Sequence, residues 1–87
     1  MTTTAWMWEA RAAEGRAAEL REWAAAEAVP AVRGAAGLTR TELFTAPGER
    51  VLVITWWTGE PVALPEPPAG LLARPVHRWS FTSELVE

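Results

Sequence analysis

The apolar residues are densest in the stretch 51–57, Val-Leu-Val-Ile-Thr-Trp-Trp, which contains almost no polar atoms. β-Branched and aromatic side chains favour a β-strand, and the following Thr58-Gly59 is a turn signal. A strand that is apolar at successive positions is typical of the centre of a sheet, where both faces are covered. We therefore predict a central strand, Arg50–Trp57, on which the rest of the chain packs.

A second predicted strand, Leu38–Thr45, precedes it and alternates more openly between polar and apolar residues. The four residues 46–49, Ala-Pro-Gly-Glu, are typical of a hairpin loop and would pair Thr45 with Arg50. This pairing sorts the side chains into two faces, with Arg40, Glu42, Val53, Thr55 and Trp57 on one and Leu43, Leu52, Ile54 and Trp56 on the other. A β-bulge would swap that assignment.

Two further strands are predicted near the ends of the sequence, at Thr4–Ala10 and Val76–Thr82. Successive side chains of a strand point to opposite faces of the sheet. In the first strand, Trp6 and Trp8 therefore share a face. In the last strand, His77, Trp79 and Phe81 share one face, and Arg78 and Ser80 share the other. We interpret Trp6 and Trp8 as structural residues.

One helix is predicted from about Arg16 to Val29 or slightly beyond, because Ala and Glu are strong helix formers. Its apolar side chains recur at helical spacing, at Leu20, Trp23, Ala24, Ala28 and Ala31. Pro30 lacks a backbone donor and is expected to kink or end the helix. Gly34 and Gly37 are then expected to terminate it.

The segment Thr58–Pro75 holds five of the seven prolines, so a helix cannot run through it. We expect an ordered, extended cover with one helical turn near Ala69–Leu72. Four apolar side chains are its expected anchors: Val62, Leu64, Leu71 and Leu72. The predicted order is β-α-β-β-(Pro-rich segment)-β, a split β-α-β unit whose second helix is reduced or lost. The prediction is therefore a single α+β domain, residues 1–87, with a ferredoxin-like topology.

Composition excludes several classes of function. The sequence has no Cys and no Asp, which excludes disulfides, thiolate nucleophiles and a Ser-His-Asp triad. One His cannot form a His-based metal site alone, although a dimer could bring two together, and we expect no metal. The net charge is −3 and the eight cations, all Arg, are scattered, so no partner nucleic acid or anionic membrane is indicated. Without a signal peptide or a membrane-spanning run, a cytoplasmic location is expected.

The aromatic content points to self-association. Six Trp and two Phe are a large apolar load for 87 residues. A chain of this size buries only roughly 60–65% of its unfolded surface. Some of these rings are therefore expected to face a ligand pocket or a second copy of the chain in a homodimer.

Several segments together resemble a known family. They are Trp-Met-Trp-Glu-Ala-Arg at 6–11, Gly-Arg at 15–16, Pro-Ala-Val-Arg-Gly-Ala-Ala-Gly at 30–37, Thr-Glu-Leu-Phe at 41–44 and the strand 51–57. This pattern resembles the dimeric α/β-barrel superfamily and, within it, the small antibiotic-biosynthesis monooxygenase-like proteins. The resemblance covers residues 4–57 and, more loosely, 76–82.

The resemblance implies a ferredoxin-like monomer whose sheet packs on that of a second monomer to form an α/β barrel, with a pocket between each sheet and its helices. Many members oxidise or cyclise aromatic, polyketide-like substrates, often without metal or flavin, so no cofactor is expected. Trp57 matches the Trp that ends the third strand of the family. Val53 stands where the cofactor-free oxygenases have an Asn, and this sequence contains no Asn.

Glu27 is the first candidate for acid–base chemistry. On a helical wheel it falls between Leu20 and Trp23, inside the apolar face. A carboxyl group held against indole has its charged form disfavoured, which suits a general acid or base near neutral pH. In the alternative interpretation, Glu27 lies at the edge of this face and reaches solvent or an Arg.

The other candidates come from the predicted strands. His77 is an alternative base, and Arg40 a candidate to hold a developing oxyanion, with Arg78 as a second cation for substrate binding. Three indoles are predicted to line the pocket: Trp23, Trp57 and Trp79. In the alternative interpretation, all of these are core, interface or surface residues.

Two function hypotheses follow. The first is a small cofactor-independent biosynthetic enzyme that abstracts a proton from an aromatic or apolar substrate and leads it to oxygenation or cyclisation. The second is a non-catalytic ligand-binding or scaffolding dimer. A closed cavity that contains a polar group from Glu27, His77 or Arg40 would favour the enzyme, and a filled core would favour the scaffold.

Overall fold

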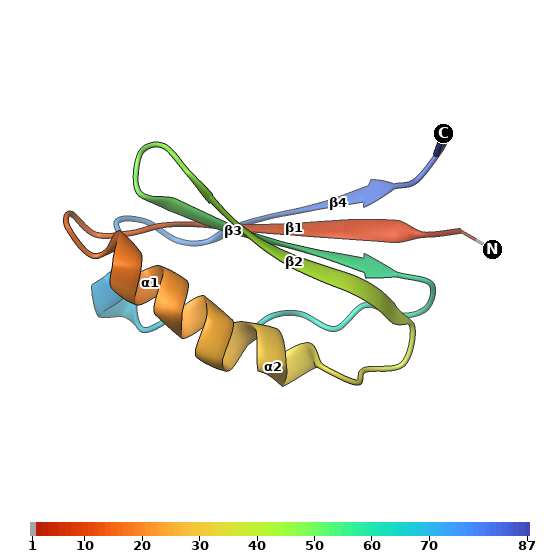
Figure 1. The fold of residues 1–87 in the computed structure, drawn as a ribbon, viewed down its shortest axis with the longest axis horizontal. Helices are drawn as coiled ribbons and strands as arrows, with labels where there is room; N and C mark the ends of the chain where they lie inside the picture. Colours follow the sequence, from red (N-terminus) through yellow and green to blue (C-terminus); the bar gives the residue numbers. More distant parts are fainter. Residues whose placement is uncertain (1) are drawn as a thin grey trace.

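The computed structural model describes residues 2–87 as one antiparallel sheet with a helical layer on one face (Figure 1). The strands are β1 (Thr4–Arg11), β2 (Leu38–Ala46), β3 (Arg50–Trp57) and β4 (His77–Thr82), and their order in the sheet is β2-β3-β1-β4. All neighbouring strands are antiparallel. The predicted α+β, ferredoxin-like topology is confirmed, and an extended segment occupies the place of the second helix.

The helical layer is one continuous run from α1 (Ala17–Trp23) through a π-helical segment (Ala24–Ala28) to α2 (Val29–Val32). Its buried residues are spaced by four: Leu20, Ala24, Ala28 and Val32. In a pure α-helix of 3.6 residues per turn such a spacing drifts around the axis, whereas the wider π turn keeps it on one line. The π segment therefore decides which residues face the sheet.

The helix continues past Pro30 to Val32 and ends before Gly34, whose φ of 80° terminates it as predicted. In α geometry the ring of a proline clashes with the carbonyl four residues earlier. Here Pro30 directly follows the π segment, in which the N–H of Val29 donates to the carbonyl of Ala24, five residues back. The widened turn explains why Pro30 does not end the helix.

The hairpin differs from the prediction by one residue. Ala46 pairs with Arg50, so the connecting loop is Pro47-Gly48-Glu49. Gly48 and Glu49 have φ values of 82° and 59°, which place two successive residues in the left-handed region. The predicted pairing of Thr45 with Arg50 is therefore wrong, and the one-residue shift moves the β2 side chains from Arg40 onward to the other face. A register shift between Leu38 and Arg40 leaves Leu38 paired with Trp57, as in the predicted register.

As a consequence, some side chains of the hairpin lie on the face opposite to the predicted one. On the helix-facing side lie Thr41, Leu43, Val53, Thr55 and Trp57, and on the opposite side lie Arg40, Glu42, Phe44, Leu52, Ile54 and Trp56. The predicted face of each β3 residue is confirmed, and the predicted faces of Arg40, Glu42 and Leu43 are wrong.

The core lies between the sheet and the helix. Its most deeply buried large side chains are Trp57, Leu20, Val32, Val51 and Val53. The segment 58–76 adds to this layer from the same side of the sheet as the helix (Figure 1). Leu64 and Leu71 are buried and anchor it as predicted, while Val62 is 46% exposed and does not.

This proline-rich segment is extended apart from the 3-10 turn Ala69–Leu71, as predicted. A bridge between Ala12 and Leu72 and a bond from the N–H of Ala73 to the carbonyl of Arg11 attach its end to β1. Over residues 2–87, no helix has the length and apolar character needed to cross a membrane.

Candidate functional site

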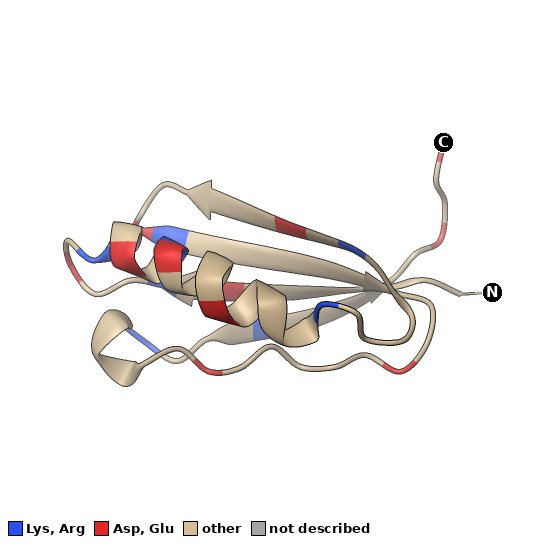
Figure 2. Ribbon diagram, turned by 60° about the horizontal axis from the view of Figure 1, so that its bottom comes forward, with Lys and Arg blue, Asp and Glu red and all other residues tan. Residues whose placement is uncertain are grey.

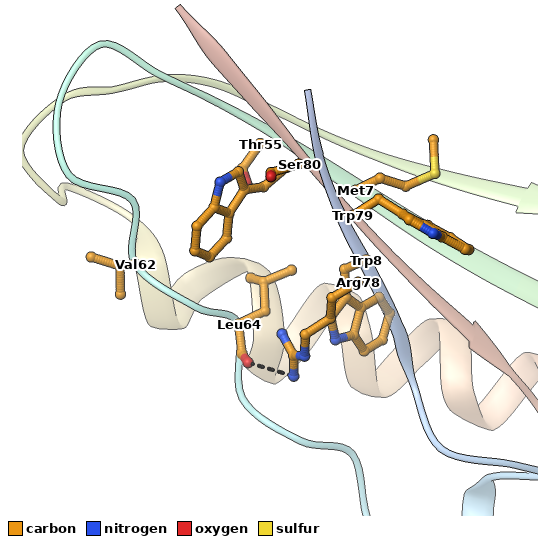
Figure 3. A pocket seen from close by; sticks show the side chains of 9 residues that line it. Met7, Trp8, Thr55, Val62, Leu64, Arg78, Trp79 and Ser80 are labelled. Atoms are coloured by element: carbon orange, nitrogen blue, oxygen red, sulfur yellow. Dashed lines mark hydrogen bonds between the residues drawn. The ribbon is translucent and has the colours of Figure 1, made fainter. Parts of the chain in front are cut away.

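A cavity of about 220 Å³ lies between the sheet and the proline-rich segment (Figure 3). The residues that line it are Trp6, Met7, Trp8, Thr55, Val62, Leu64, Arg78, Trp79 and Ser80. They come from β1, β3, β4 and the extended segment. The cavity thus occupies the place between sheet and cover where the second helix of the fold is missing.

Strand pairing explains the polar wall of this cavity. Trp6 is paired with Ser80 on one side and with Thr55 on the other, while Trp8 is paired with Arg78. Directly opposite residues of an antiparallel pair point to the same face. The two indoles, the two hydroxyls and the guanidinium therefore all lie on the helix-facing side of the sheet.

Thr55 is buried, and its hydroxyl oxygen accepts a hydrogen bond of 2.8 Å from Nε1 of Trp57. Trp57 itself is 0% exposed and is not among the residues that line the cavity. It supports the cavity from behind, through Thr55. The predicted pocket role of Trp57 is therefore indirect.

Arg78 attaches the cover to the sheet. Its Nη2 donates to the carbonyl oxygen of Leu64 at 3.1 Å and to the carboxylate of Glu66 at 2.6 Å. The first of these bonds is drawn in Figure 3. Arg78 was predicted as a substrate-binding cation, and the structure places it in the cavity wall.

Trp8 carries a polar atom without a partner. The residue is 2% exposed, and its indole Nε1 has no hydrogen-bond partner within residues 2–87. Its ring stacks on that of Trp23, with centroids 6.3 Å apart and 24° between the planes. Trp23 packs behind Trp8 and does not line the cavity, contrary to the prediction.

Glu27 is exposed, so the prediction that it lies in the apolar face is wrong. Figure 2 shows the acidic side of the helix turned away from the sheet. The wheel that placed Glu27 between Leu20 and Trp23 assumed α geometry throughout. The π segment holds more residues per turn and rotates Glu27 out of the face. It is not brought to the cavity.

His77 and Trp79 point to the opposite face of the sheet. Their rings meet edge to face at 5.5 Å, and Nδ1 of His77 lies 3.6 Å from the carboxylate of Glu9. Figure 3 shows Trp79 and Met7 on the far side of the strands from Leu64. Trp79 is among the residues that border the cavity although its ring lies on the opposite face, and His77 is not among them.

Arg40 also lies on the opposite face because of the hairpin register. Its guanidinium is 5.1 Å from the ring centroid of Trp56 and forms an ion pair of 2.5 Å with Glu42. It is therefore not among the residues that line the cavity, and the prediction that it shares a face with Thr55 and Trp57 is wrong. None of the three predicted catalytic side chains lines the cavity.

Glu9 forms the other charged centre of the structure. It is 6% exposed, and its carboxylate accepts bonds from Arg74 at 2.5 Å and from Arg50 at 3.3 Å. The hydrogen bond from Arg74 is the main cause that lowers the pKa of Glu9, against its burial, which raises it. Glu9 is thus held as an anion that ties β1 to β3 and to the segment before β4. Within residues 2–87, no group of three or more His or Glu residues could hold a metal ion.

Sequence reasoning missed Trp6, Trp8, Thr55 and Ser80 as cavity residues. It sorted Trp6 with Trp8 and Arg78 with Ser80 correctly, strand by strand. The missing step was the pairing of β1 with β4, which puts both groups on one face. The order of a split β-α-β fold, with the last strand beside the first, contained that signal.

No protein-family profile matches the sequence, and no curated protein matches it significantly. The fold is similar to the solved structure of Rv0793 from Mycobacterium tuberculosis, with a TM-score of 0.68. The alignment covers 98% of this chain and 97% of that chain, with 16% of residues identical. At this level of identity the likeness shows the fold alone.

Proposed function

We propose that this protein binds a small aromatic or otherwise apolar molecule in the cavity between the sheet and the proline-rich segment. The observation that carries the proposal is a cavity of about 220 Å³ bordered by two indoles, Trp6 and Trp8, together with a guanidinium and two hydroxyl groups. Apolar walls with a few convergent polar groups are typical of small-molecule sites.

Binding is favoured over proton abstraction by the protein. Within the part of the chain that the structure describes, neither a carboxylate nor an imidazole is among the lining side chains. A general base must lie within hydrogen-bond reach of the proton it removes. Glu27 and His77 do not meet this condition from their observed positions.

A second candidate is catalysis in the same cavity, in the biosynthetic role that the resemblance to the antibiotic-biosynthesis monooxygenase-like proteins implies. Arg78 favours it, because a guanidinium in the wall could stabilise an anionic oxygen, the role that was predicted for Arg40. The substrate would then have to ionise without a base from the protein. Cofactor-independent oxygenation or cyclisation of a readily ionised phenol or β-diketone fits this requirement.

We also propose that two copies of the chain associate through the open face of the sheet, in the manner of a dimeric α/β barrel. No described segment covers this face, whose apolar members include Met7, Leu52, Ile54, Trp56, Trp79 and Phe81. Several of its charged side chains already form ion pairs within one copy, Arg40 with Glu42 and Glu9 with Arg74 and Arg50. A charge that is already paired loses less on burial than an isolated charge does.

The binding proposal is tested by filling the cavity. Ser80→Leu adds apolar volume to its wall, and it is expected to weaken binding of a one- or two-ring aromatic compound by at least about tenfold in calorimetry. Thr82→Leu is the matched control, because Thr82 is the next residue of β4 on the same face, beyond the cavity. Equal affinities of the two variants would refute this site, and so would a wild-type protein that bound no member of an aromatic panel.

A further inference from the structure

We infer that the ligand of the cavity is a one- or two-ring aromatic carboxylate, and that the buried indole N–H of Trp8 is the donor that anchors its acid group. This inference rests on the proposed binding function and adds the ligand class to it. It is carried by the donor–acceptor inventory of the wall, by the unpaired nitrogen of Trp8 and by the volume of the cavity.

The side chains of the wall can mostly donate hydrogen bonds. Trp8 and Arg78 are donors only, and Ser80 can donate through its hydroxyl. The oxygen of Thr55 already accepts a bond from Trp57, which leaves its own hydrogen available. No carboxylate is present among the lining side chains that the structure describes. A complementary ligand therefore brings acceptors, and a negative charge is favoured over a positive one.

Trp8 indicates where in the cavity the acid group of the ligand binds. Buried donors in proteins nearly always have a partner, because an unpaired one loses its bonds to water without replacement. Trp8 is only 2% exposed and Nε1 has no partner among the described residues. In Figure 3 the nitrogen-bearing edge of its ring is turned to the side on which Arg78 and Leu64 lie. Because this nitrogen is buried, a ligand oxygen reaches it through a small displacement of the cavity wall, and it would then complete the unpaired group.

Arg78 already binds a carboxylate, that of Glu66 at 2.6 Å. The side chain of Glu66 is 67% exposed, and exposed ion pairs of this kind are weak. A ligand carboxylate can therefore replace Glu66 at the guanidinium at little cost. The bond from Arg78 to the carbonyl of Leu64 would hold the cover in place during this exchange.

The volume limits the size of the ligand. An apolar protein cavity of roughly 150 Å³ accepts benzene. The volume of about 220 Å³ found here fits one ring with an acid group, or two fused rings with the acid group at the Arg78 end. A polyketide of three or four rings would have to extend into solvent.

The test uses three naphthalenes of nearly equal shape: 2-naphthoate, the neutral 2-methylnaphthalene and the cationic 2-naphthylmethylamine. Titration of the 87-residue protein, followed by calorimetry and tryptophan fluorescence, is expected to rank them in that order. The carboxylate should bind at least about tenfold tighter than the hydrocarbon. Equal or reversed ranking would overturn the inference while leaving the binding proposal intact, and absence of all binding would overturn both.

A second measurement identifies the donor. In protein labelled with ¹⁵N-tryptophan, the indole N–H proton of Trp8 should move downfield when 2-naphthoate is added, because it gains a hydrogen bond. The indole proton of Trp57, which already donates to Thr55, is the internal control and should move much less. A bound carboxylate that left the Trp8 signal in place would refute its role as anchor.

Trp8→Phe keeps an aromatic ring and removes the donor, so it should lower the affinity for 2-naphthoate about tenfold and leave that for 2-methylnaphthalene within about twofold. Trp56→Phe, on the open face, is the matched control and should change neither. If Trp8→Phe does not fold, the signals of the wild-type protein decide the question alone.

Discussion

The two faces of the sheet are built from similar apolar residues but have different surroundings. On the helix-facing side Trp8, Val53 and Trp57 are at most 2% exposed. On the other side Trp79 and Phe81 are 45% and 52% exposed. One face is therefore covered by the chain itself, and the other is left open.

This difference follows from the number of helices and strands that the fold contains. A two-layer α+β domain has only one layer of helix to place, and here the second helix of that layer is replaced by an extended segment. The covered face is therefore closed around Val53 and Trp57 and incomplete near Trp6 and Arg78, where the cavity lies. Over the described residues, no helix packs on the open face, and Arg74 covers it only at the end where Glu9 lies. We propose that a ligand fills the cavity on the covered face and that a second copy of the chain covers the open face.

The largest expected effect concerns the covered face. Trp57→Ala removes a side chain that is 0% exposed and should lower the free energy of unfolding by about 3–5 kcal/mol, measured by urea denaturation. Because small domains are stable by only about 5–15 kcal/mol, a loss of this size can leave the variant partly unfolded even without urea, which would also agree with the prediction. The matched control on the open face is Trp56→Ala, and a loss as large in this variant would contradict the contrast between the faces.

The second prediction concerns the open face. Ile54→Lys places a charge in its middle and should weaken self-association by on the order of a hundredfold, because an unmatched charge would be buried. Light scattering across a dilution series measures this change. Ala26→Lys, on the exposed side of the helix, is the control and should leave the mass unchanged. A wild-type protein that is monomeric at micromolar concentration would refute the dimer proposal.

The sequence predicted most of the fold because its signals were local. Alternation identified the strands, and five prolines excluded a helix in the segment 58–75. The faces of β1, β3 and β4 were also predicted correctly, since a side-chain period of two needs no knowledge of the loops. The extended cover, with a single turn at Ala69–Leu71, was confirmed for the same reason.

Two of the predicted catalytic residues were misplaced, because two small irregularities decide where they lie. Glu49 follows Gly48 in the left-handed region, which shortens the hairpin loop and moves Arg40 to the other face. The π segment turns Glu27 to solvent. Each is a shift of about one residue that has no signature in the hydrophobic pattern, and together they removed two of the three catalytic candidates.

The third prediction uses pH to test the charged centre at the edge of the open face. The pKa of Glu9 is lowered in the folded state, chiefly by the hydrogen bond from Arg74. Its contribution to stability is therefore present above the unfolded pKa, about 4.3, and is lost as the pH falls through the lowered value. Glu9→Gln should destabilise the protein by roughly 1.5–3 kcal/mol at pH 7, and this loss should shrink as the pH falls below the unfolded pKa and through the lowered one.

Glu19→Gln is the control for this experiment. The pKa of Glu19 is also lowered, by its hydrogen bond with Arg16, but this ion pair lies in solvent on the helix. Its removal should cause a smaller loss of stability than Glu9→Gln at pH 7. If the difference between wild type and Glu9→Gln did not shrink on acidification, the buried carboxylate would not be the source of the effect.

The smallest expected change in the free energy of unfolding is that of Arg40→Gln. Comparing this variant with Arg78→Gln tests directly which face of the sheet binds the ligand. Its contacts with Trp56 and Glu42 are largely exposed, with 65% of the arginine side chain accessible. Arg40→Gln should therefore change the free energy of unfolding by less than about 1 kcal/mol.

Because Arg40 lies across the sheet from the cavity, the variant should bind 2-naphthoate as well as wild type, whereas Arg78→Gln should bind it about tenfold more weakly. A loss of binding in Arg40→Gln with unchanged stability would mean that β2 takes the register first predicted from the sequence, with Arg40 on the helix-facing side.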